Sequence, residues 1–185
     1  MISYAGIGSR DITSEESRKC QDLAAFLSSA GYTLYSGNAD GADKAFQEGS
    51  NGKFVAFLPW DGFNRKQTDS HGGEYLTTGS YPECDKYVDM FHPNPRALSQ
   101  GARKLMARNS SQVLGYGDKP RPVFVICCAN PADNKGNVQG GTGQAVRIAM
   151  SVGIPVFNLR NRSDVDKLKT LLTDINIRMI SESQK

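Results

Sequence analysis

The stretch Ile2-Ser3-Tyr4-Ala5-Gly6-Ile7-Gly8-Ser9-Arg10 sets the expectation for the fold. Its first residues, Ile2–Ala5, form a short apolar run typical of a buried strand, and a glycine turn follows at once. A helix is predicted after Thr13, because Thr13-Ser14-Glu15-Glu16 has the form of a capping box. A strand, a glycine turn and a helix in this order make the first half of a βαβ unit.

The same pattern recurs along the chain. Further strands are predicted at Thr33–Tyr35, Phe54–Leu58, Val123–Cys128 and Pro155–Phe157. Further helices are predicted at Ala42–Glu48, Pro95–Leu114, Gln144–Val152 and Asp164–Thr173, while Gly31 ends the first helix. The alternation predicts one α/β domain over residues 1–185, Rossmann-like and doubly wound, with a mostly parallel sheet and helices on both faces.

Composition excludes several classes of protein. The chain has 185 residues, 38% of them hydrophobic, and no run approaches the roughly 18 apolar residues of a membrane span. Met1 leads into the first strand without a signal peptide, so we expect a soluble cytoplasmic protein with no membrane partner. A net charge of +3 suits a small anionic ligand but is modest for binding nucleic acid, so we do not expect a nucleic-acid partner.

The cysteines predict no metal site. Two of them, Cys127 and Cys128, lie inside an apolar run, where cysteine acts as a small hydrophobe. Neither the four cysteines nor the two histidines show zinc-type spacing: Cys20, Cys84, Cys127, Cys128, His71 and His92. We expect buried free thiols and neither a metal nor a cofactor.

One segment, Asp61–Asn94, has no sustained period of either kind and is long for a connection in a small domain. We interpret it as a lid; the alternative is an added excursion with little regular structure. The tail, Ser181–Lys185, is predicted to be frayed.

Three glycine turns stand between a predicted strand and a predicted helix: Gly6–Arg10, Gly37–Asp43 and Gly140–Gln144. The carboxyl ends of parallel strands share one edge, so these turns should converge on one crevice. Glycine lets the backbone approach a ligand closely, and the N–H groups of a helix N-terminus attract an anion. A phosphate group is the expected occupant; the alternative is that the glycines serve only the turn geometry.

Several side chains have two interpretations. Arg10 suits a phosphate clamp or a surface ion pair, and Asp43 suits a helix cap or a contact to a ligand hydroxyl, as does Asp40. Trp60 suits stacking on a base or a place at the rim of the core. Arg108 is expected to face the crevice, whereas Arg103 and Lys104 should be solvated.

The candidate ligand-binding residues share a place in or beside these turns, or on the helix that carries Arg108. They are Gly6, Gly8, Ser9, Arg10, Ser36, Gly37, Asn38, Ala39, Asp43, Trp60, Arg108, Asn109, Gly140, Gly141, Thr142, Gly143 and Gln144.

With these motifs the chain resembles the SLOG superfamily, which joins DNA-processing protein A and the lonely-guy phosphoribohydrolases. Gly6–Arg10 is similar to its first-strand turn, Ser36–Asp43 to its second glycine segment, and Arg108-Asn109 to its arginine-bearing helix. Gly140–Ala145 is similar to its closing glycine loop, and the match spans about residues 2–158. The resemblance implies a nucleotide-binding Rossmann-like fold and a homo-oligomer.

A departure from the lonely-guy pattern bears on function. That family continues its last loop to a glutamate that works with an arginine in cleaving an N-glycosidic bond; here Gln144 replaces the threonine and Arg147 the glutamate. Arg108 therefore lacks its carboxylate partner, and no catalytic residue is assigned. A relocated carboxylate, Glu74 or Asp40, is the alternative.

The resemblance favours a binder that senses or sequesters a nucleotide-derived small molecule, such as an ADP-ribose or cyclic-ADP-ribose-like signal. A stand-alone member, without a fused effector, would suit a phage-encoded anti-defence sponge in the cytosol of a bacterial host. The alternatives are a nucleoside-phosphate N-glycosidase or related nucleotide hydrolase or transferase, and a single-stranded DNA-binding recombination mediator.

Overall fold

The computed structural model describes residues 1–64 and 72–183. Six strands form one sheet in which every pairing is parallel. They are β1 (Ile2–Gly8), β2 (Tyr32–Ser36), β3 (Phe54–Leu58), β4 (Glu74–Thr77), β5 (Val125–Cys128) and β6 (Val156–Asn158), in the order β4-β3-β2-β1-β5-β6. The predicted α/β fold with a parallel sheet is confirmed.

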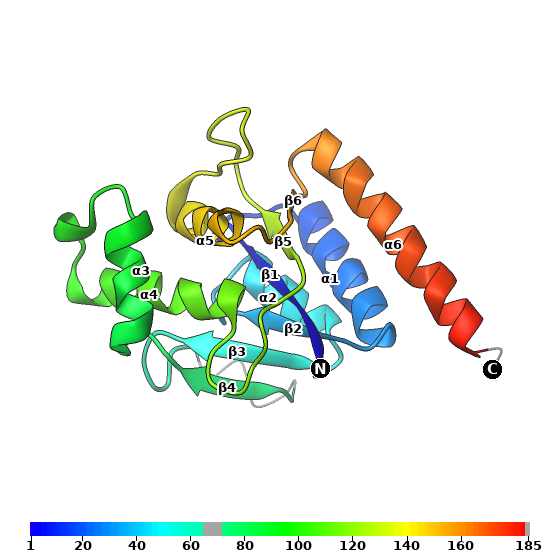
Figure 1. Ribbon diagram of the computed structural model, residues 1–185, viewed down its shortest axis with the longest axis horizontal. Coiled ribbons are helices and arrows are strands. Elements are labelled where there is room, and N and C mark those ends of the chain that lie inside the picture. Colours follow the sequence, from blue (N-terminus) through cyan, green and yellow to red (C-terminus); the bar gives the residue numbers. More distant parts are fainter. Residues whose placement is uncertain (65–71, 184–185) are drawn as a thin grey trace.

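Helices cover both faces of this sheet (Figure 1). They are α1 (Ser14–Ser29), α2 (Ala42–Gly49), α3 (Pro82–Phe91), the short 3-10 helix η2 (Pro95–Ala97), α4 (Gln100–Leu114), α5 (Gly140–Ser151) and α6 (Arg162–Ser183). One hydrophobic core joins the sheet to α1, α2 and α6, and includes Leu27, Phe46 and Leu168. A second joins the other face to α4 and α5, and includes Val113 and Ile148.

Local sequence explains where several helices begin. Thr13 caps α1 as predicted: its Oγ1 accepts from the Glu16 N–H at 3.1 Å, and a Glu16 carboxylate oxygen accepts from the Thr13 N–H at 2.8 Å. The helix predicted from Pro95 is instead divided, because Leu98 is extended and Ser99 caps a new helix, α4, through the Ala102 N–H. The last helix is longer than predicted and continues to Ser183, so the chain is not frayed from Ser181.

The segment Asp61–Asn94 contains more regular structure than its sequence pattern suggests. Its described part supplies the edge strand β4 and the helix α3, which packs on α4. The alternative interpretation, an excursion with little regular structure, is wrong for this part. A role as a lid stays a prediction, and residues 65–71, which include His71, lie outside the described residues.

The chain order places the switch point of the sheet beside β1. From β1 the chain runs outward through β2, β3 and β4, and then crosses back to β5 on the other side of β1. In open α/β sheets a ligand crevice forms at the carboxyl ends of the strands where the order reverses. The turns that follow β1, β2 and β5 therefore frame the candidate site.

All four cysteines are buried free thiols, as predicted. Across residues 1–64 and 72–183, no helix is long and apolar enough to cross a membrane. The same residues hold no group of three His, Cys, Asp or Glu side chains that could bind a metal ion.

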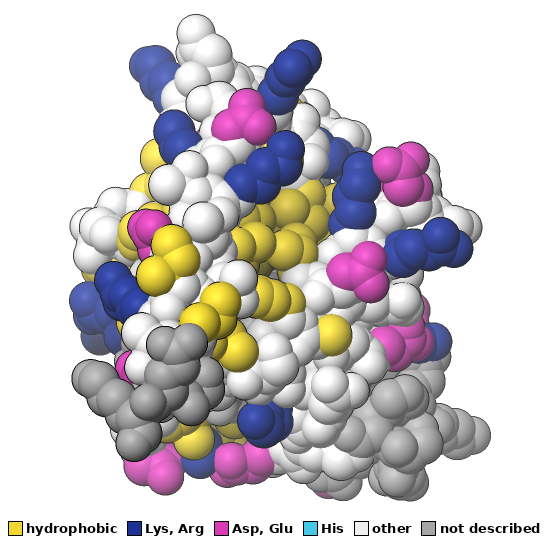
Figure 2. Space-filling view, turned by 90° about the vertical axis from the view of Figure 1, so that its right-hand side faces the viewer, with side chains coloured by type: hydrophobic (Ala, Val, Ile, Leu, Met, Phe, Trp, Pro, Cys, Tyr) yellow, Lys and Arg dark blue, Asp and Glu magenta, His cyan; other side chains and the backbone are white. Residues whose placement is uncertain are grey.

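An apolar hollow lies between α1 and α6, and the side chains that line it include Leu23, Phe26 and Leu172. Figure 2, which faces the side that carries α6 in Figure 1, shows apolar side chains gathered in a hollow with charged groups around it.

Candidate functional site

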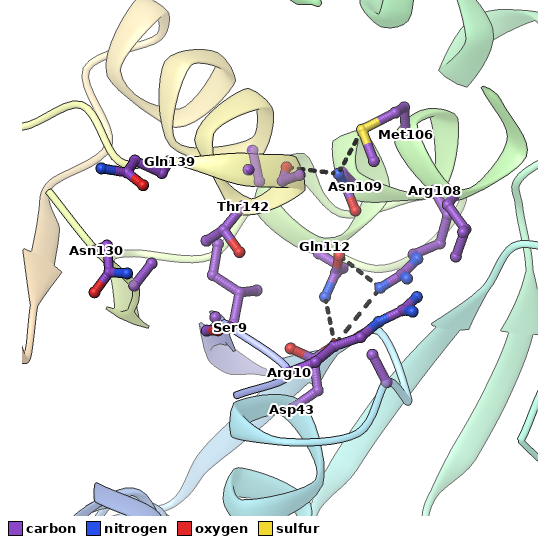
Figure 3. Close-up of a pocket in the computed structure, with 18 residues that line it drawn as sticks. Ser9, Arg10, Asp43, Met106, Arg108, Asn109, Gln112, Asn130, Gln139 and Thr142 are labelled. Atoms are coloured by element: carbon purple, nitrogen blue, oxygen red, sulfur yellow. Dashed lines mark hydrogen bonds and ion pairs between the residues drawn. The ribbon is translucent and has the colours of Figure 1, made fainter. Parts of the chain in front are cut away.

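A cavity of about 490 Å³ opens at the carboxyl edge of the sheet beside β1 and β5. This volume lies within the roughly 300–1,000 Å³ typical of small-molecule sites. Its walls come from the turns after β1 and β2, the segment after β5, and the facing sides of α4 and α5 (Figure 3). The lining residues are Ile7, Gly8, Ser9, Arg10, Ala39, Asp43, Leu105, Met106, Arg108, Asn109, Gln112, Ala129, Asn130, Gln139, Gly140, Gly141, Thr142 and Ala145.

The first glycine turn is fixed from two sides. The Ser9 N–H donates to the Cys128 carbonyl at 2.8 Å, which extends the β1–β5 ladder, and the Ser9 carbonyl accepts from the Ala42 N–H at 3.0 Å. A Cβ at Gly41 would collide with the backbone of Ser9 and Arg10, so glycine lets the first and second turns touch. The predicted convergence of these turns is confirmed.

Arg10 projects from this anchored turn into solvent. Its side chain makes no ion pair within the described part of the chain. Figure 3 shows it reaching toward the end of the cavity where Asp43 and Arg108 lie. The hydrogen bonds of Ser9 hold the backbone next to this unpaired guanidinium. A cation on a held backbone suits the binding of an anion.

Asp43 and Arg108 form a buried pair at that end. Arg108 Nη1 lies 3.6 Å from Asp43 Oδ2, and each side chain is 5% exposed. Gln112 joins them, because its Oε1 accepts from Arg108 Nη1 at 2.9 Å and its Nε2 lies 3.5 Å from Asp43 Oδ2. The Nε of Arg108 is buried without a hydrogen-bond partner within the described chain.

Burial dominates the electrostatics of this pair. It raises the pKa of Asp43, against the opposing effects of Arg108 and of hydrogen bonds from the Gly37 and Ala39 backbone. Burial also lowers the pKa of Arg108; Asp43 opposes this shift and repulsion from Arg10 adds to it. The cavity therefore holds two guanidinium groups against one carboxylate, Asp43, among its lining residues.

The third glycine turn is the first turn of a helix. The helix predicted from Gln144 begins at Gly140, because Gln139 is extended and ends the preceding segment. No side chain caps this turn, and no acidic residue lies in it. Three residues of this first turn, Gly140, Gly141 and Thr142, line the cavity, so the positive end of the helix dipole lies at its wall.

Asn109 joins α4 to this turn. Its Nδ2 lies 3.2 Å from the Gly141 carbonyl and 3.1 Å from Gln144 Oε1. The Gln144 amide in turn donates to the Tyr87 carbonyl of α3 at 3.3 Å. Gln144 is fully buried and ties three helices together without lining the cavity.

Ten of the candidate residues line the cavity: Gly8, Ser9, Arg10, Ala39, Asp43, Arg108, Asn109, Gly140, Gly141 and Thr142. Seven do not: Gly6, Ser36, Gly37, Asn38, Trp60, Gly143 and Gln144. The glycines among these seven serve close packing. A Cβ at Gly6 would lie 2.7 Å from Leu34 and Phe46, one at Gly37 would overlap Arg108, and one at Gly143 would overlap the Val138 carbonyl.

The other members of this group hold local structure. Ser36 Oγ lies 3.4 Å from the Asp43 carbonyl, and Asn38 Nδ2 donates to the Phe63 carbonyl at 2.9 Å. Trp60 meets Phe63 edge to face, with ring centroids 5.1 Å apart. The interpretation of Trp60 as a cover over neighbouring apolar groups fits this position better than stacking on a base.

Eight lining residues were missing from the candidate set: Ile7, Leu105, Met106, Gln112, Ala129, Asn130, Gln139 and Ala145. A sequence signal existed for two of them. Asn130 lies two residues after β5, close to the place that Ser9 has directly after β1, and Gln112 lies one helical turn after Arg108. For Gln139 the sequence contains no such signal, because the position of this residue depends on the loop over residues 131–138.

Neither relocated carboxylate reaches the cavity. Glu74 begins β4 and pairs with Lys119 at 2.8 Å, and Asp40 is exposed outside the lining. Arg147, at the position of the lonely-guy glutamate, donates from Nε to the Phe91 carbonyl at the end of α3, at 2.9 Å. Arg103 is partly solvated, as expected: its side chain is 30% exposed, lies outside the cavity lining, and pairs at the surface with Asp85 at 2.6 Å and Asp89 at 2.9 Å.

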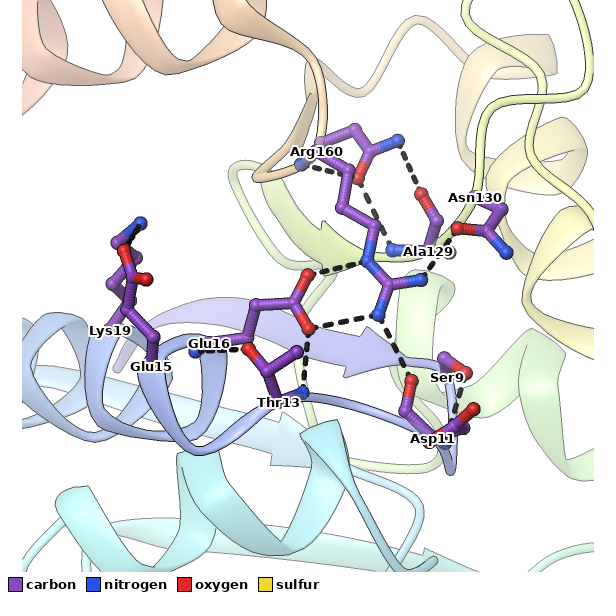
Figure 4. A network of polar contacts seen from close by, with 10 residues as sticks. Ser9, Asp11, Thr13, Glu15, Glu16, Lys19, Ala129, Asn130 and Arg160 are labelled. Atoms are coloured by element: carbon purple, nitrogen blue, oxygen red, sulfur yellow. Dashed lines mark hydrogen bonds and ion pairs between the residues drawn. The ribbon is translucent and has the colours of Figure 1, made fainter.

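A polar network supports the rim of the cavity (Figure 4). Arg160 contacts Glu16 at 2.6 Å, the Asn130 Oδ1 at 2.7 Å and the Asp11 carbonyl at 3.0 Å. Its hydrogen bond lowers the pKa of Glu16 to about 2. This one guanidinium therefore joins three segments: the turn after β1, the start of α1 and the segment after β5.

No protein-family model matches the chain, and no curated protein sequence matches it. Solved structures do. DNA processing protein A from Helicobacter pylori, whose structure describes a single-stranded DNA binding mode, has a TM-score of 0.60 at 18% identity, over 97% of this chain and 81% of that chain. The Moco carrier protein of Chlamydomonas rheinhardtii has a TM-score of 0.52 at 14% identity, over 93% and 84%. The chain therefore has a Rossmann-like fold similar to that of DNA processing protein A.

Proposed function

We propose that this protein binds a phosphate-bearing, nucleotide-derived small molecule in the cavity between α4 and α5. The observation that carries the proposal is the excess of positive charge there. Arg10 has no counter-ion in the described chain, and the uncapped start of α5 faces the same space. An anion with several acceptor oxygens would satisfy both.

The remaining lining suits the rest of a nucleotide. Asn109, Gln112, Asn130 and Gln139 offer amide groups, which can both donate and accept hydrogen bonds to a base or a ribose. Leu105, Met106 and Ala145 offer apolar contact. Within this class we favour an ADP-ribose or cyclic-ADP-ribose-like molecule.

Retention of the ligand is the activity we propose, as a sensor or a sponge would perform it. Asp43 is the one carboxylate in the described lining, and it is engaged by Arg108 and by the backbone of its own turn. A cavity of this kind holds a nucleotide without an unengaged acid or base beside it. A phage-encoded sponge against nucleotide signalling is the biological role that we propose with it.

Mass spectrometry of small molecules released by denaturing freshly purified protein tests the proposal. We expect a phosphate-bearing nucleotide derivative, and calorimetric titration with ADP-ribose should give binding that adenosine does not. Arg10→Gln should weaken binding of ADP-ribose at least tenfold, whereas Arg178→Gln, the same change of charge on exposed α6, should not. Recovery of ADP-ribose as cleaved products, or no binding of any phosphate-bearing probe, would overturn it.

Hydrolysis of a nucleotide is the second candidate, and Asp43 is the observation that favours it. Burial raises the pKa of its carboxyl, a property of general acids, and Arg108 could stabilise developing charge beside it. Incubation with nucleoside monophosphates would then yield free base, and Asp43→Asn would abolish that product. The absence of turnover across the four common monophosphates would discard this candidate.

A further inference from the structure

A second cationic hollow adjoins the candidate cavity. It lies between α1 and α2 and has a volume of about 480 Å³; we call it the α1/α2 groove. Arg10 lines both the cavity and the groove. The backbone of the turn that carries Arg10 is hydrogen-bonded to the start of α2, which places this residue at the boundary between the two spaces.

The α1/α2 groove has positive charge without a counter-ion. Arg10, Arg18 and Lys44 line it, and none of them makes an ion pair within residues 1–64 and 72–183. Its one carboxylate, Glu48, accepts a hydrogen bond from Gln21 Nε2 at 2.8 Å. Three cations against one carboxylate would attract a second anionic group to this surface.

Side chains, not the helix end, provide this attraction. The start of α1 is closed by its own capping box, in which Thr13 and Glu16 satisfy each other's backbone N–H groups. Arg18 lines the groove from α1, together with Ser14 and Ser17. Lys44 lines it from α2. The charge can therefore be removed by substitution without disturbing a helix cap.

We infer that the ligand extends past Arg10, so that one phosphate lies in the cavity and a second, separate phosphate lies in the α1/α2 groove against Arg18 and Lys44. This inference rests on the proposed function. Within its class of phosphate-bearing nucleotide derivatives, it selects a ligand whose two phosphates are separated by a sugar over the directly linked phosphates of ADP-ribose. A mononucleotide fills the cavity alone. A nucleotide with two phosphates separated by a sugar, as in a 5′-phosphorylated dinucleotide, engages both spaces.

Isothermal titration compares the four common nucleoside monophosphates with the corresponding 5′-phosphorylated dinucleotides. We expect each dinucleotide whose monophosphate binds to bind at least tenfold more tightly. The double variant Arg18→Gln/Lys44→Gln should lower dinucleotide affinity to that of the monophosphate and leave the monophosphate unchanged. The matched control, Lys167→Gln/Arg178→Gln, removes the same charge from exposed α6.

The outcomes separate the two proposals. One outcome is that monophosphates bind and that the dinucleotide binds wild type and Arg18→Gln/Lys44→Gln with the same affinity. This result would overturn the second phosphate site and leave the cavity as a nucleotide site. Absence of all nucleotide binding would overturn the proposed function itself. A steady rise of affinity and salt dependence from dinucleotide to decanucleotide would assign the groove to a nucleic-acid strand and overturn the small ligand.

Discussion

Arg108 Nη1 and Asp43 Oδ2 lie 3.6 Å apart in the interior, joined by Gln112, where α4 meets the turn after β2. The pair does two things at once. Asp43 holds the turn through the Gly37 N–H at 2.9 Å, and Arg108 forms the end wall of the cavity. The shape of the site thus depends on a buried ion pair.

Removing one partner should cost more than removing both charges. Arg108→Met leaves Asp43 buried without its counter-ion, and we expect a loss of about 3–5 kcal/mol in the free energy of unfolding at pH 7. The deficit should shrink as the pH falls, starting above the ordinary range of carboxyl groups, because burial raises the pKa of Asp43 and the protonated side chain needs no cation. Adding Asp43→Asn should recover about 1–3 kcal/mol of coupling, measured by urea denaturation of the full cycle. Strictly additive losses would show that the two side chains do not stabilise each other.

Gly37 makes room for this pair. A Cβ there would overlap Nη1 of Arg108 and lie 2.7 Å from Asp43 Oδ2. We expect Gly37→Ala to destabilise the protein by about 1–3 kcal/mol and to weaken ligand binding, because the guanidinium must move. Gly101→Ala is the matched control: it lies in α4, with no atom closer than 4.0 Å to its added Cβ. There we expect a gain of about 0.5–1 kcal/mol, and thermal unfolding of both variants checks the difference in sign.

The sequence predicted the framework of the site because local signals set it. The capping box at Thr13, the glycine turns and the apolar strands each act over a few residues, and they placed β1, β2, β3, β5 and β6 correctly. The convergence of the turns then followed from parallel pairing alone. Ten cavity residues came from this reasoning.

What the sequence could not show depends on contacts between distant segments. Ser36, Gly37 and Gln144 carry motif-like signals, yet they serve the structure behind the cavity wall. The strand β4 was missed because it is short, partly exposed and follows residues with no clear period. A glycine that approaches a ligand and one that approaches a buried guanidinium look the same in one sequence.

Acid should weaken the network around Arg160. The hydrogen bond from Arg160 lowers the pKa of Glu16 from 4.5 to about 2, so the stabilisation is complete above the ordinary pKa and is lost as the pH falls through the lowered one. Glu16→Gln keeps a capping side chain but removes the charge. We expect it to cost about 1–2 kcal/mol at pH 7 and only a small part of that near pH 2, measured by denaturant unfolding from pH 7 to pH 2. A gap that stays constant over this range would contradict the ion pair as its source.

Arg147 offers a direct test of why a motif position need not be a catalytic position. Its Nε donates to the Phe91 carbonyl, so the side chain caps the end of α3 and lies outside the cavity lining. Arg147→Glu restores the carboxylate of the lonely-guy pattern, yet it places that charge against the negative end of a helix dipole. We expect a loss of about 1–2 kcal/mol in stability and no release of free base from nucleoside monophosphates.

Arg147→Met separates the two effects of that change. It removes the hydrogen bond to Phe91 without adding a negative charge, so its loss should be about 1 kcal/mol, smaller than that of Arg147→Glu. Calorimetric titration should show unchanged nucleotide affinity in both variants, because neither alters a cavity residue. Free base produced by Arg147→Glu, but not by Arg147→Met, would mean that this position does reach the ligand and that the cavity extends to the end of α3.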